Sequence, residues 1–537
     1  MRHLLKIKNI KIEGLEAGAV KPIINGIDLT LRRGEVLGLI GESGAGKSTL
    51  GLASMGYTRS GCEIAEGSIK FDGIELTSLS AGKRRKLRGS RIAYVAQSAA
   101  ASFNPAHKLI HQFAEVPVQQ GLMSYAEAEE KAIELYRRLD LPDPEKIGYR
   151  YPHQVSGGQL QRAMVAMAMA ADPDLIIFDE PTTALDVTTQ IEVLAAIKDV
   201  ISLKNTAAIY ITHDLAVVAQ LADRIMVLRY GDMVEEGEAK ALLENPQEEY
   251  TRDLLSVRTL RNPGSDKKRK PQTLLEVEDL YAAYSPGKPV VQGVEFSIDR
   301  RKTVAVVGES GSGKTTVARI ITGLLPPYQG RILFDGQELS RRLADRDRET
   351  LRRMQMIYQM PDVALNPKQK IVKIIGRPLS FYANVNGGEQ AARVKELLDM
   401  VELPAAYMQR YPSELSGGEK QRICIARALA ADPDLIICDE VTSALDQLVA
   451  EEVLQLLQRL QVELGVSYLF ITHDLATVKA IADEIIVMLN GRIVEQGGRN
   501  EVLKPPHHEY TERLLSSVPE MDPDWLDNLL EEREVAL

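Results

Sequence analysis

The stretch GEVLGLIGESGAGKST, residues 34–49, decides the fold. Its first half is apolar and indicates a buried strand, and its second half matches the pattern G-x4-G-K-[ST], which leads from a strand into a helix. The glycines of such a loop let backbone amides turn inward around phosphate groups, and the helix N-terminus adds partial positive charge. The stretch TVAVVGESGSGKTT, residues 303–316, repeats the pattern. The sequence therefore predicts two phosphate-binding loops.

The rest of the chain also repeats once, in the same order. VSGGQLQR at 155–162 recurs as LSGGEKQR at 415–422, and DPDLIIFDE at 172–180 recurs as DPDLIICDE at 432–440. ITHDLA is found at both 211–216 and 471–476. The two loop lysines are 267 residues apart and the later motifs 260, so the insertions that distinguish the halves all precede the segments VSGGQLQR and LSGGEKQR. This is a duplicated domain and not a short solenoid repeat.

The domain boundaries follow from the repeat. We expect a first domain at 1–257, a linker at 258–272, a second domain at 273–519 and an acidic tail at 520–537. The linker RTLRNPGSDKKRKPQ combines turn-forming residues with four consecutive basic ones. A solvated linker is one interpretation, and contact with anionic lipid headgroups or with a partner is the other.

Each half is predicted to be α/β. The runs LIIF (175–178), AAIYIT (207–212) and RIMVL (224–228) are continuously apolar, which is typical of strands buried on both faces of a parallel sheet. Helical patterns separate them, so we expect two tandem phosphate-loop domains, each a mostly parallel sheet flanked by helices.

Composition limits the function. The 537 residues carry a net charge of −10, which disfavours nucleic acid as the main partner. The three cysteines form no close pair, which is typical of a reducing, cytoplasmic compartment. The sequence shows no run of about 20 apolar residues, so membrane spans would come from other subunits.

The loop residues and two acidic pairs carry the predicted chemistry. Lys47 and Lys314 would reach the β- and γ-phosphates, and Ser48 and Thr315 would bind Mg²⁺. Asp179 and Asp439 each end an apolar strand and would hold Mg²⁺, while the adjacent Glu180 and Glu440 would polarise the attacking water. The predicted loop contacts to nucleotide are Gly41, Ser43, Gly44, Gly46, Lys47, Ser48, Thr49, Gly308, Ser310, Gly311, Gly313, Lys314, Thr315 and Thr316.

By these motifs the chain resembles the ATP-binding-cassette (ABC) family over nearly its whole length, twice. The resemblance implies a helical subdomain in each half and a signature loop that completes the site on the other half. These signature loops are Ser156, Gly157, Gly158 and Ser416, Gly417, Gly418. It also implies that Gln97 and Gln359 touch Mg²⁺ and the water, that His213 and His473 contact the γ-phosphate, and that the two halves pair within the chain. Asp186 and Asp446 match the loop that couples the two sites.

The two halves differ at a position where the family carries an aromatic residue. Tyr284 in the second half matches the aromatic residue that stacks on adenine, and alignment places Gly14 opposite it in the first half. Stacking on a base contributes about 1–3 kcal/mol in single-strand binding. We therefore expect weaker ATP binding at the first site. Val441 replaces Pro181 in the second half, and we expect little effect from this change.

A finer resemblance points to importers. ASFNPAHK (101–108) and VALNPKQK (363–370) are similar to a segment of the dipeptide, oligopeptide and nickel importer ATPases, and so are the tails at 245–257 and 504–519. This implies an ATPase subunit at the cytoplasmic face of the inner membrane that powers uptake of peptides or a related solute. Its partners would be two transmembrane permease subunits and, indirectly, an extracytoplasmic solute-binding protein. The alternative is a soluble twin-cassette ATPase that acts on ribosomes or on a soluble enzyme.

Overall fold

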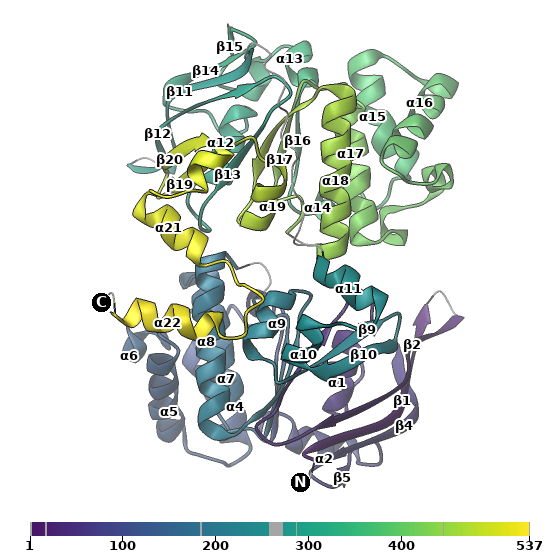
Figure 1. The fold of residues 1–537 in the computed structure, drawn as a ribbon, viewed down its shortest axis with the longest axis vertical. Coiled ribbons are helices and arrows are strands. Elements are labelled where there is room, and N and C mark those ends of the chain that lie inside the picture. Colours follow the sequence, from purple (N-terminus) through teal and green to yellow (C-terminus); the bar gives the residue numbers. More distant parts are fainter. Residues whose placement is uncertain are drawn as a thin grey trace. The chain divides into compact units, whose positions relative to one another are not determined.

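The structure is a computed structural model and describes residues 3–16, 19–182, 185–256, 272–285, 287–443 and 445–535. It divides into two compact units (Figure 1). The first comprises Met1–Ser256 together with Pro519–Leu537, and the second comprises Val257–Val518. The chain thus ends in the unit in which it began. The linker expected at 258–272 lies outside the described residues, apart from Gln272.

The first unit is built on a six-stranded sheet of order β10-β9-β3-β8-β7-β6. All its strands run parallel except β10, which is antiparallel to β9. The strands are β3 (Val36–Ile40), β6 (Ile92–Val95), β7 (Leu175–Asp179), β8 (Ala207–Ile211), β9 (Arg224–Arg229) and β10 (Asp232–Glu238). The prediction of α/β units with a mostly parallel sheet is confirmed, because each apolar run identified in the first half coincides with one of these strands.

A second, antiparallel sheet completes the core of this unit. Its order is β2-β1-β4-β5, formed by β1 (Leu5–Glu16), β2 (Ala19–Leu31), β4 (Cys62–Phe71) and β5 (Ile74–Glu75). Helix α1 (Lys47–Ser54) shares one buried cluster with both sheets, through residues such as Leu50, Phe71 and Ile209. Each such side chain stabilises the fold by about 1.5–3 kcal/mol, so the helix that follows the phosphate loop is firmly held.

The second unit repeats both sheets. Their orders are β12-β11-β14-β15 and β16-β17-β18-β13-β19-β20, and α12 (Lys314–Ile321) takes the place of α1. The strands are β11 (Thr273–Ser285), β12 (Lys288–Asp299), β13 (Thr303–Val307), β14 (Gln329–Phe334), β15 (Gln337–Glu338), β16 (Met354–Ile357), β17 (Leu435–Asp439), β18 (Ser467–Ile471), β19 (Glu484–Leu489) and β20 (Arg492–Gly498).

Helices between and after the strands make up the rest of each unit. In the first unit they are α2 (Ala81–Leu87), α3 (Ala99–Ser102), α4 (Leu109–Gln119), α5 (Tyr125–Arg138), α6 (Pro144–Ile147), α7 (Gly157–Met169), α8 (Val187–Lys204), α9 (Leu215–Leu221), α10 (Ala239–Glu244), α11 (Glu249–Ser256) and α22 (Trp525–Val535). In the second they are α13 (Arg348–Arg353), α14 (Pro361–Ala364), α15 (Ile371–Ala383), α16 (Gly387–Met400), α17 (Gly417–Leu429), α18 (Gln447–Leu464), α19 (Leu475–Ile481), α20 (Arg499–Val502) and α21 (Glu509–Ser516). None of the helices in the described ranges is long and apolar enough to span a bilayer.

Candidate nucleotide sites

Each phosphate loop leaves the carboxyl end of a central parallel strand. The first glycine of each loop adopts a positive φ, +143° at Gly41 and +148° at Gly308. A Cβ atom would lie 2.1 Å from the carbonyl oxygen of Leu228 at Gly41, and 2.2 Å from that of Met488 at Gly308. Only glycine fits these positions, so the spacing of glycines in the sequence reflects close packing of the loop on the neighbouring strand.

The loop lysines contact their own loops, and the loop hydroxyls contact the aspartates at the strand ends. The Nζ atom of Lys47 donates hydrogen bonds to the carbonyl oxygens of Gly41 (2.7 Å) and Glu42 (2.8 Å), and Lys314 makes the same two contacts in its own loop. The Oγ atom of Ser48 donates to Oδ1 of Asp179 at 2.7 Å.

Thr315 and Asp439 repeat the second contact at 3.0 Å. A hydroxyl beside a carboxylate offers the hard oxygen donors that Mg²⁺ prefers, so these residues fit magnesium. Burial raises the pKa of Asp439, with the charge of Glu440 adding to the shift, although donation from Thr315 opposes it.

Tyr94 is a residue of the first site that the sequence interpretation missed. Its hydroxyl donates to the second oxygen of Asp179, Oδ2, at 2.5 Å. Met356 stands at the matching place in the second unit, three residues before Gln359, so Asp439 lacks this donor. The only sequence signal for this role of Tyr94 was its position three residues before Gln97.

The glutamates lie in clusters with the same geometry in both units. In the first unit, Nε2 of Gln97 donates to Oε2 of Glu180 at 2.9 Å, and Nδ1 of His213 lies 3.4 Å from Oε1. Gln359, Glu440 and His473 repeat the arrangement at 2.6 Å and 3.4 Å. In each unit the structure thus brings together three side chains that are spread over more than 110 residues of sequence.

The backbone is strained at both glutamates. Glu180 and Glu440 each have φ of +50°, in the left-handed region, which costs about 1–3 kcal/mol for a residue other than glycine. Their amides donate to the carbonyl oxygens of Ile211 and Ile471 at 2.9 Å, which ties the turn to the adjacent strand. The strain therefore lies at the residues predicted to act on water.

The histidines and the second glutamate influence each other's ionisation. Burial lowers the pKa of His213 and of His473, but the hydrogen bond and charge of the neighbouring glutamate outweigh it, so both values are raised. Burial raises the pKa of Glu440, and contact with His473 outweighs it, so the value is lowered. The pairing therefore favours an ionised carboxylate at Glu440.

The signature loops form the N-termini of α7 and α17. Ser156 and Ser416 cap these helices, each side chain accepting a hydrogen bond at 3.3 Å from the amide three residues on. A Cβ on Gly158 would lie 2.2 Å from Cγ2 of Thr189, whereas a Cβ on Gly157 would meet nothing within 4 Å. The second glycine is therefore required by packing and the first leaves its amide open. The pairing of each signature loop with the opposite site stays a prediction.

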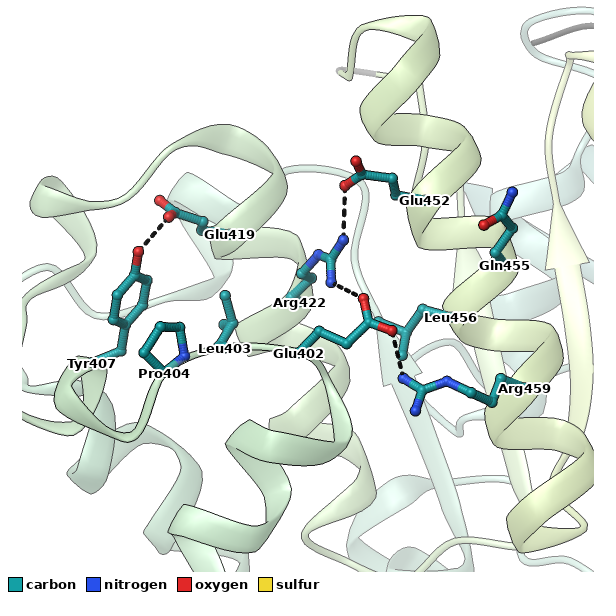
Figure 2. A pocket seen from close by; sticks show the side chains of 10 residues that line it. All are labelled: Glu402, Leu403, Pro404, Tyr407, Glu419, Arg422, Glu452, Gln455, Leu456 and Arg459. Atoms are coloured by element: carbon teal, nitrogen blue, oxygen red, sulfur yellow. Dashed lines mark hydrogen bonds and ion pairs between the residues drawn. The ribbon is translucent and has the colours of Figure 1, made fainter. Parts of the chain in front are cut away.

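A pocket of about 620 Å³ lies behind the signature loop of the second unit (Figure 2). The Tyr407 hydroxyl donates to Oε1 of Glu419 at 2.6 Å, and Arg422 on the same helix bonds Glu402 (2.7 Å) and Glu452 (2.8 Å). Burial raises the pKa of Glu419, but donation from Tyr407 and from the Ser416 amide outweighs it and lowers the value. This network braces the base of α17.

The two units differ where adenine is expected to stack. Tyr284 at the end of β11 is 54% exposed, and its hydroxyl accepts a hydrogen bond from Arg319 of α12 at 3.1 Å and lies 3.3 Å from Oγ1 of Thr316. Gly14 takes this position in β1, where a Cβ would lie 2.7 Å from Cδ1 of Ile23. Ile23 therefore occupies the space that a side chain at residue 14 would need.

Two tyrosines of the tails also reach the phosphate loops, which the sequence interpretation did not foresee. The Tyr250 hydroxyl accepts a hydrogen bond from the amide of Glu42 at 3.2 Å, and the Tyr510 hydroxyl accepts one from the amide of Glu309 at 2.9 Å. Both tyrosines are buried. Their occurrence at the same place in both tails was the available signal, but only the fold shows what they contact.

Comparison with known proteins gives consistent matches. A family model described as ABC transporter matches residues 24–183 and 291–443, and one described as Oligopeptide/dipeptide transporter, C-terminal region, matches 494–535. The chain is 36% identical over 565 residues to the Glutathione import ATP-binding protein GsiA of Salmonella typhimurium. It is 37% identical over 569 residues to the protein of that name from Escherichia coli O6:H1. Both alignments cover 97% of this chain and 90% of the relative.

A solved structure shows a likeness of fold alone. The archaeal ribosome recycling factor aABCE1, in complex with the ribosomal stalk protein aP1, matches with a TM-score of 0.58 and 21% identity. The match covers 88% of this chain and 87% of that one.

Proposed function

This chain belongs to the ABC transporter family, and we propose that it powers the import of small peptides or peptide-like solutes such as glutathione. It is an ATP-hydrolysing importer subunit with two tandem ABC units. The observation that carries the choice of solute is the identity of 36% across 97% of the chain to a glutathione importer ATPase. The match of residues 494–535 to the oligopeptide/dipeptide C-terminal region supports the same class of solute.

The residues of each site have distinct roles in this proposal. The loop amides with Lys47 and Lys314 bind the phosphates, and Ser48 with Asp179, like Thr315 with Asp439, holds Mg²⁺, with Gln97 and Gln359 completing its ligands. Mg²⁺ supplies positive charge that offsets the charge developing on the transferred phosphoryl group.

Glu180 and Glu440 orient and polarise the attacking water. The contacts with Gln97 and His213, and with Gln359 and His473, hold these carboxylates from two sides. A general base aimed in this way contributes on the order of 10²–10⁴ in rate.

The movement produced by hydrolysis is passed to membrane subunits. We infer two transmembrane permease subunits as partners, with an extracytoplasmic binding protein delivering the solute, and a peripheral position at the cytoplasmic face of the inner membrane. The import function of the relatives supports this arrangement. Action on ribosomes or on a soluble enzyme is not favoured, because the similarity to aABCE1 extends only to the fold.

Affinity purification from membranes, followed by mass spectrometry, tests the proposal. We expect two multi-span subunits to co-purify, and ATP-dependent uptake of labelled glutathione or dipeptides to require the chain. The double variant Glu180→Gln, Glu440→Gln should abolish uptake and lower ATPase activity about 100-fold. Glu249→Gln with Glu509→Gln, at exposed matching positions in the two tails, is the control. Recovery of ribosomes or of a soluble enzyme instead would contradict the importer assignment.

A further inference from the structure

The chain's last segment lies on the first unit, although the second unit precedes it in sequence. Residues from Pro519 onward group with the first unit, and α22 lies against α8 (Figure 1). Leu526 is fully buried and Leu529 is 7% exposed, while Asn528 between them is exposed. This spacing is that of a helix with one apolar face, and that face is covered.

A single buried glutamine anchors the segment. Gln220 on α9 is 3% exposed, and its Nε2 atom donates to the carbonyl oxygens of Glu520 at 2.8 Å and Asp522 at 2.9 Å. Its Oε1 atom accepts a hydrogen bond from the amide of Leu526 at 3.0 Å. One side chain therefore satisfies three backbone groups around the turn that starts α22. A buried amide is retained at low cost when its groups are paired in this way.

An ion pair on the neighbouring helix fixes the first turn of α22. The Nζ atom of Lys198 on α8 lies 2.7 Å and 2.8 Å from the two carboxylate oxygens of Asp527. The pair is partly exposed, so it contributes orientation more than affinity.

The second unit lacks both anchors. Ala480 stands at the position of Gln220, and Gln458 stands at the position of Lys198. In that unit Gln458 donates to the carbonyl oxygen of Ala480 at 2.9 Å. The residues that hold the C-terminal segment are thus present in only one of the two copies, although the helices that carry them are common to both.

We propose that residues 519–535 act as a strap, docked on α8 and α9 of the first unit, which joins the two units a second time. The linker makes the first connection and the strap makes the other. Helix α9 begins directly after His213 and Asp214, so the strap docks on the helix that follows this histidine. The strap is independent of which solute is imported.

The full-length chain carries its own reporter, because Trp525 at the start of α22 is the one tryptophan of the sequence. The variant Gln220→Ala, Lys198→Gln installs the residues of the second unit, which the same helices already accept. We expect its Trp525 emission to shift to the red and acrylamide quenching to rise at least twofold, with Asn528→Ala as the control. Unchanged emission and quenching would overturn the docking.

Exchanging the two charges of the ion pair provides a second test if that variant does not fold. Asp527→Lys should raise quenching, and adding Lys198→Asp should restore it. Failure of the second change to restore quenching would contradict the ion pair.

Cleavage of the linker tests the second connection. A protease site introduced into 258–272 of the full-length chain allows the linker to be cut after folding. Without ATP, the two fragments should co-elute in size-exclusion chromatography, and their dissociation constant should rise at least tenfold in Gln220→Ala, Lys198→Gln. Fragments that separate without these changes, or that associate equally with and without them, would overturn the strap.

Discussion

The two units present different residues beside the helix that follows the phosphate loop. In the second unit Tyr284 lies exposed and contacts Arg319, whereas in the first Gly14 is flanked by Ile23, and Leu52 replaces the arginine. The clusters around Glu180 and Glu440 are, by contrast, nearly identical. The two units thus share the groups expected to act on the γ-phosphate and differ in those expected to bind the base. We therefore expect the two sites to differ more in their affinity for ATP than in how they hydrolyse it.

The largest expected effect comes from the glutamates, taken one at a time. Glu440→Gln and Glu180→Gln should each remove one site's turnover, and the double variant should retain about 1% of activity. At ATP concentrations below saturation, Glu440→Gln should cause the greater loss, because the site with Tyr284 fills first. Steady-state ATPase assays across ATP concentrations measure this. If the two single variants lost equal ATPase activity at every ATP concentration, the two sites would not differ in function.

The next effect concerns the adenine platform. With Lys314→Ala leaving only the first site and Lys47→Ala only the second, we expect ATP to bind about tenfold more tightly to the second site, since stacking is worth about 1–3 kcal/mol. Tyr284→Ala in the Lys47→Ala chain should abolish the difference, and Tyr284→Phe should keep it. Titration calorimetry measures both. Equal dissociation constants in the two single-site chains would contradict this interpretation.

A smaller effect is expected from the tail tyrosines. Tyr510→Phe removes the hydroxyl that accepts a hydrogen bond from the partly buried amide of Glu309, and losing such a bond costs about 0.5–1.5 kcal/mol. Hydrogen exchange at this amide should become about fivefold faster or more, with ATP affinity falling in parallel. Tyr250→Phe should have the weaker effect, because its hydrogen bond is 3.2 Å long and that of Tyr510 is 2.9 Å. Exchange unchanged in both variants would show that the contact does not hold the loop.

The smallest expected effect is a pH dependence that should be alike in both units. The pKa of His473 is raised above its usual 6.5, so its pairing with Glu440 stabilises the fold fully below pH 6.5 and less as pH rises through the raised value. The pKa of Glu440 is lowered from 4.5, so its contribution is present above pH 4.5 and is lost as pH falls through the lowered value.

The ATP-free chain should therefore melt at a higher temperature than His473→Gln. The difference should be largest between pH 4.5 and 6.5, where it should be on the order of a few degrees. Circular dichroism melting curves over this range measure the difference. His213→Gln should show the same decline in its effect as pH rises, because the pKa of His213 is also raised. A difference that does not change between pH 5.5 and 9 would argue against the ion pair.

The sequence predicted those parts of the site that local patterns encode. The loop glycines, the acidic residues at strand ends and the strands themselves follow from local motifs and from short apolar runs such as 175–178 and 207–212. The contacts of Tyr250 and Tyr510 could not be predicted, because each joins residues more than 200 positions apart and depends on how α11 and α21 pack. The positive φ of Glu180 and Glu440 is set by the adjacent strand, and glutamate is not a residue type that indicates a positive φ.

The division of the first unit between the two ends of the chain also affects its synthesis. Residues Val257–Val518 leave the ribosome between the two parts of that unit. At about 5–20 residues per second, roughly 15–50 seconds pass before α22 emerges. During that interval the surface of α8 and α9 that receives Leu526 and Leu529 stays uncovered on an otherwise completed unit. Newly made chains stalled within the second unit therefore expose a specific apolar patch to which folding factors can bind.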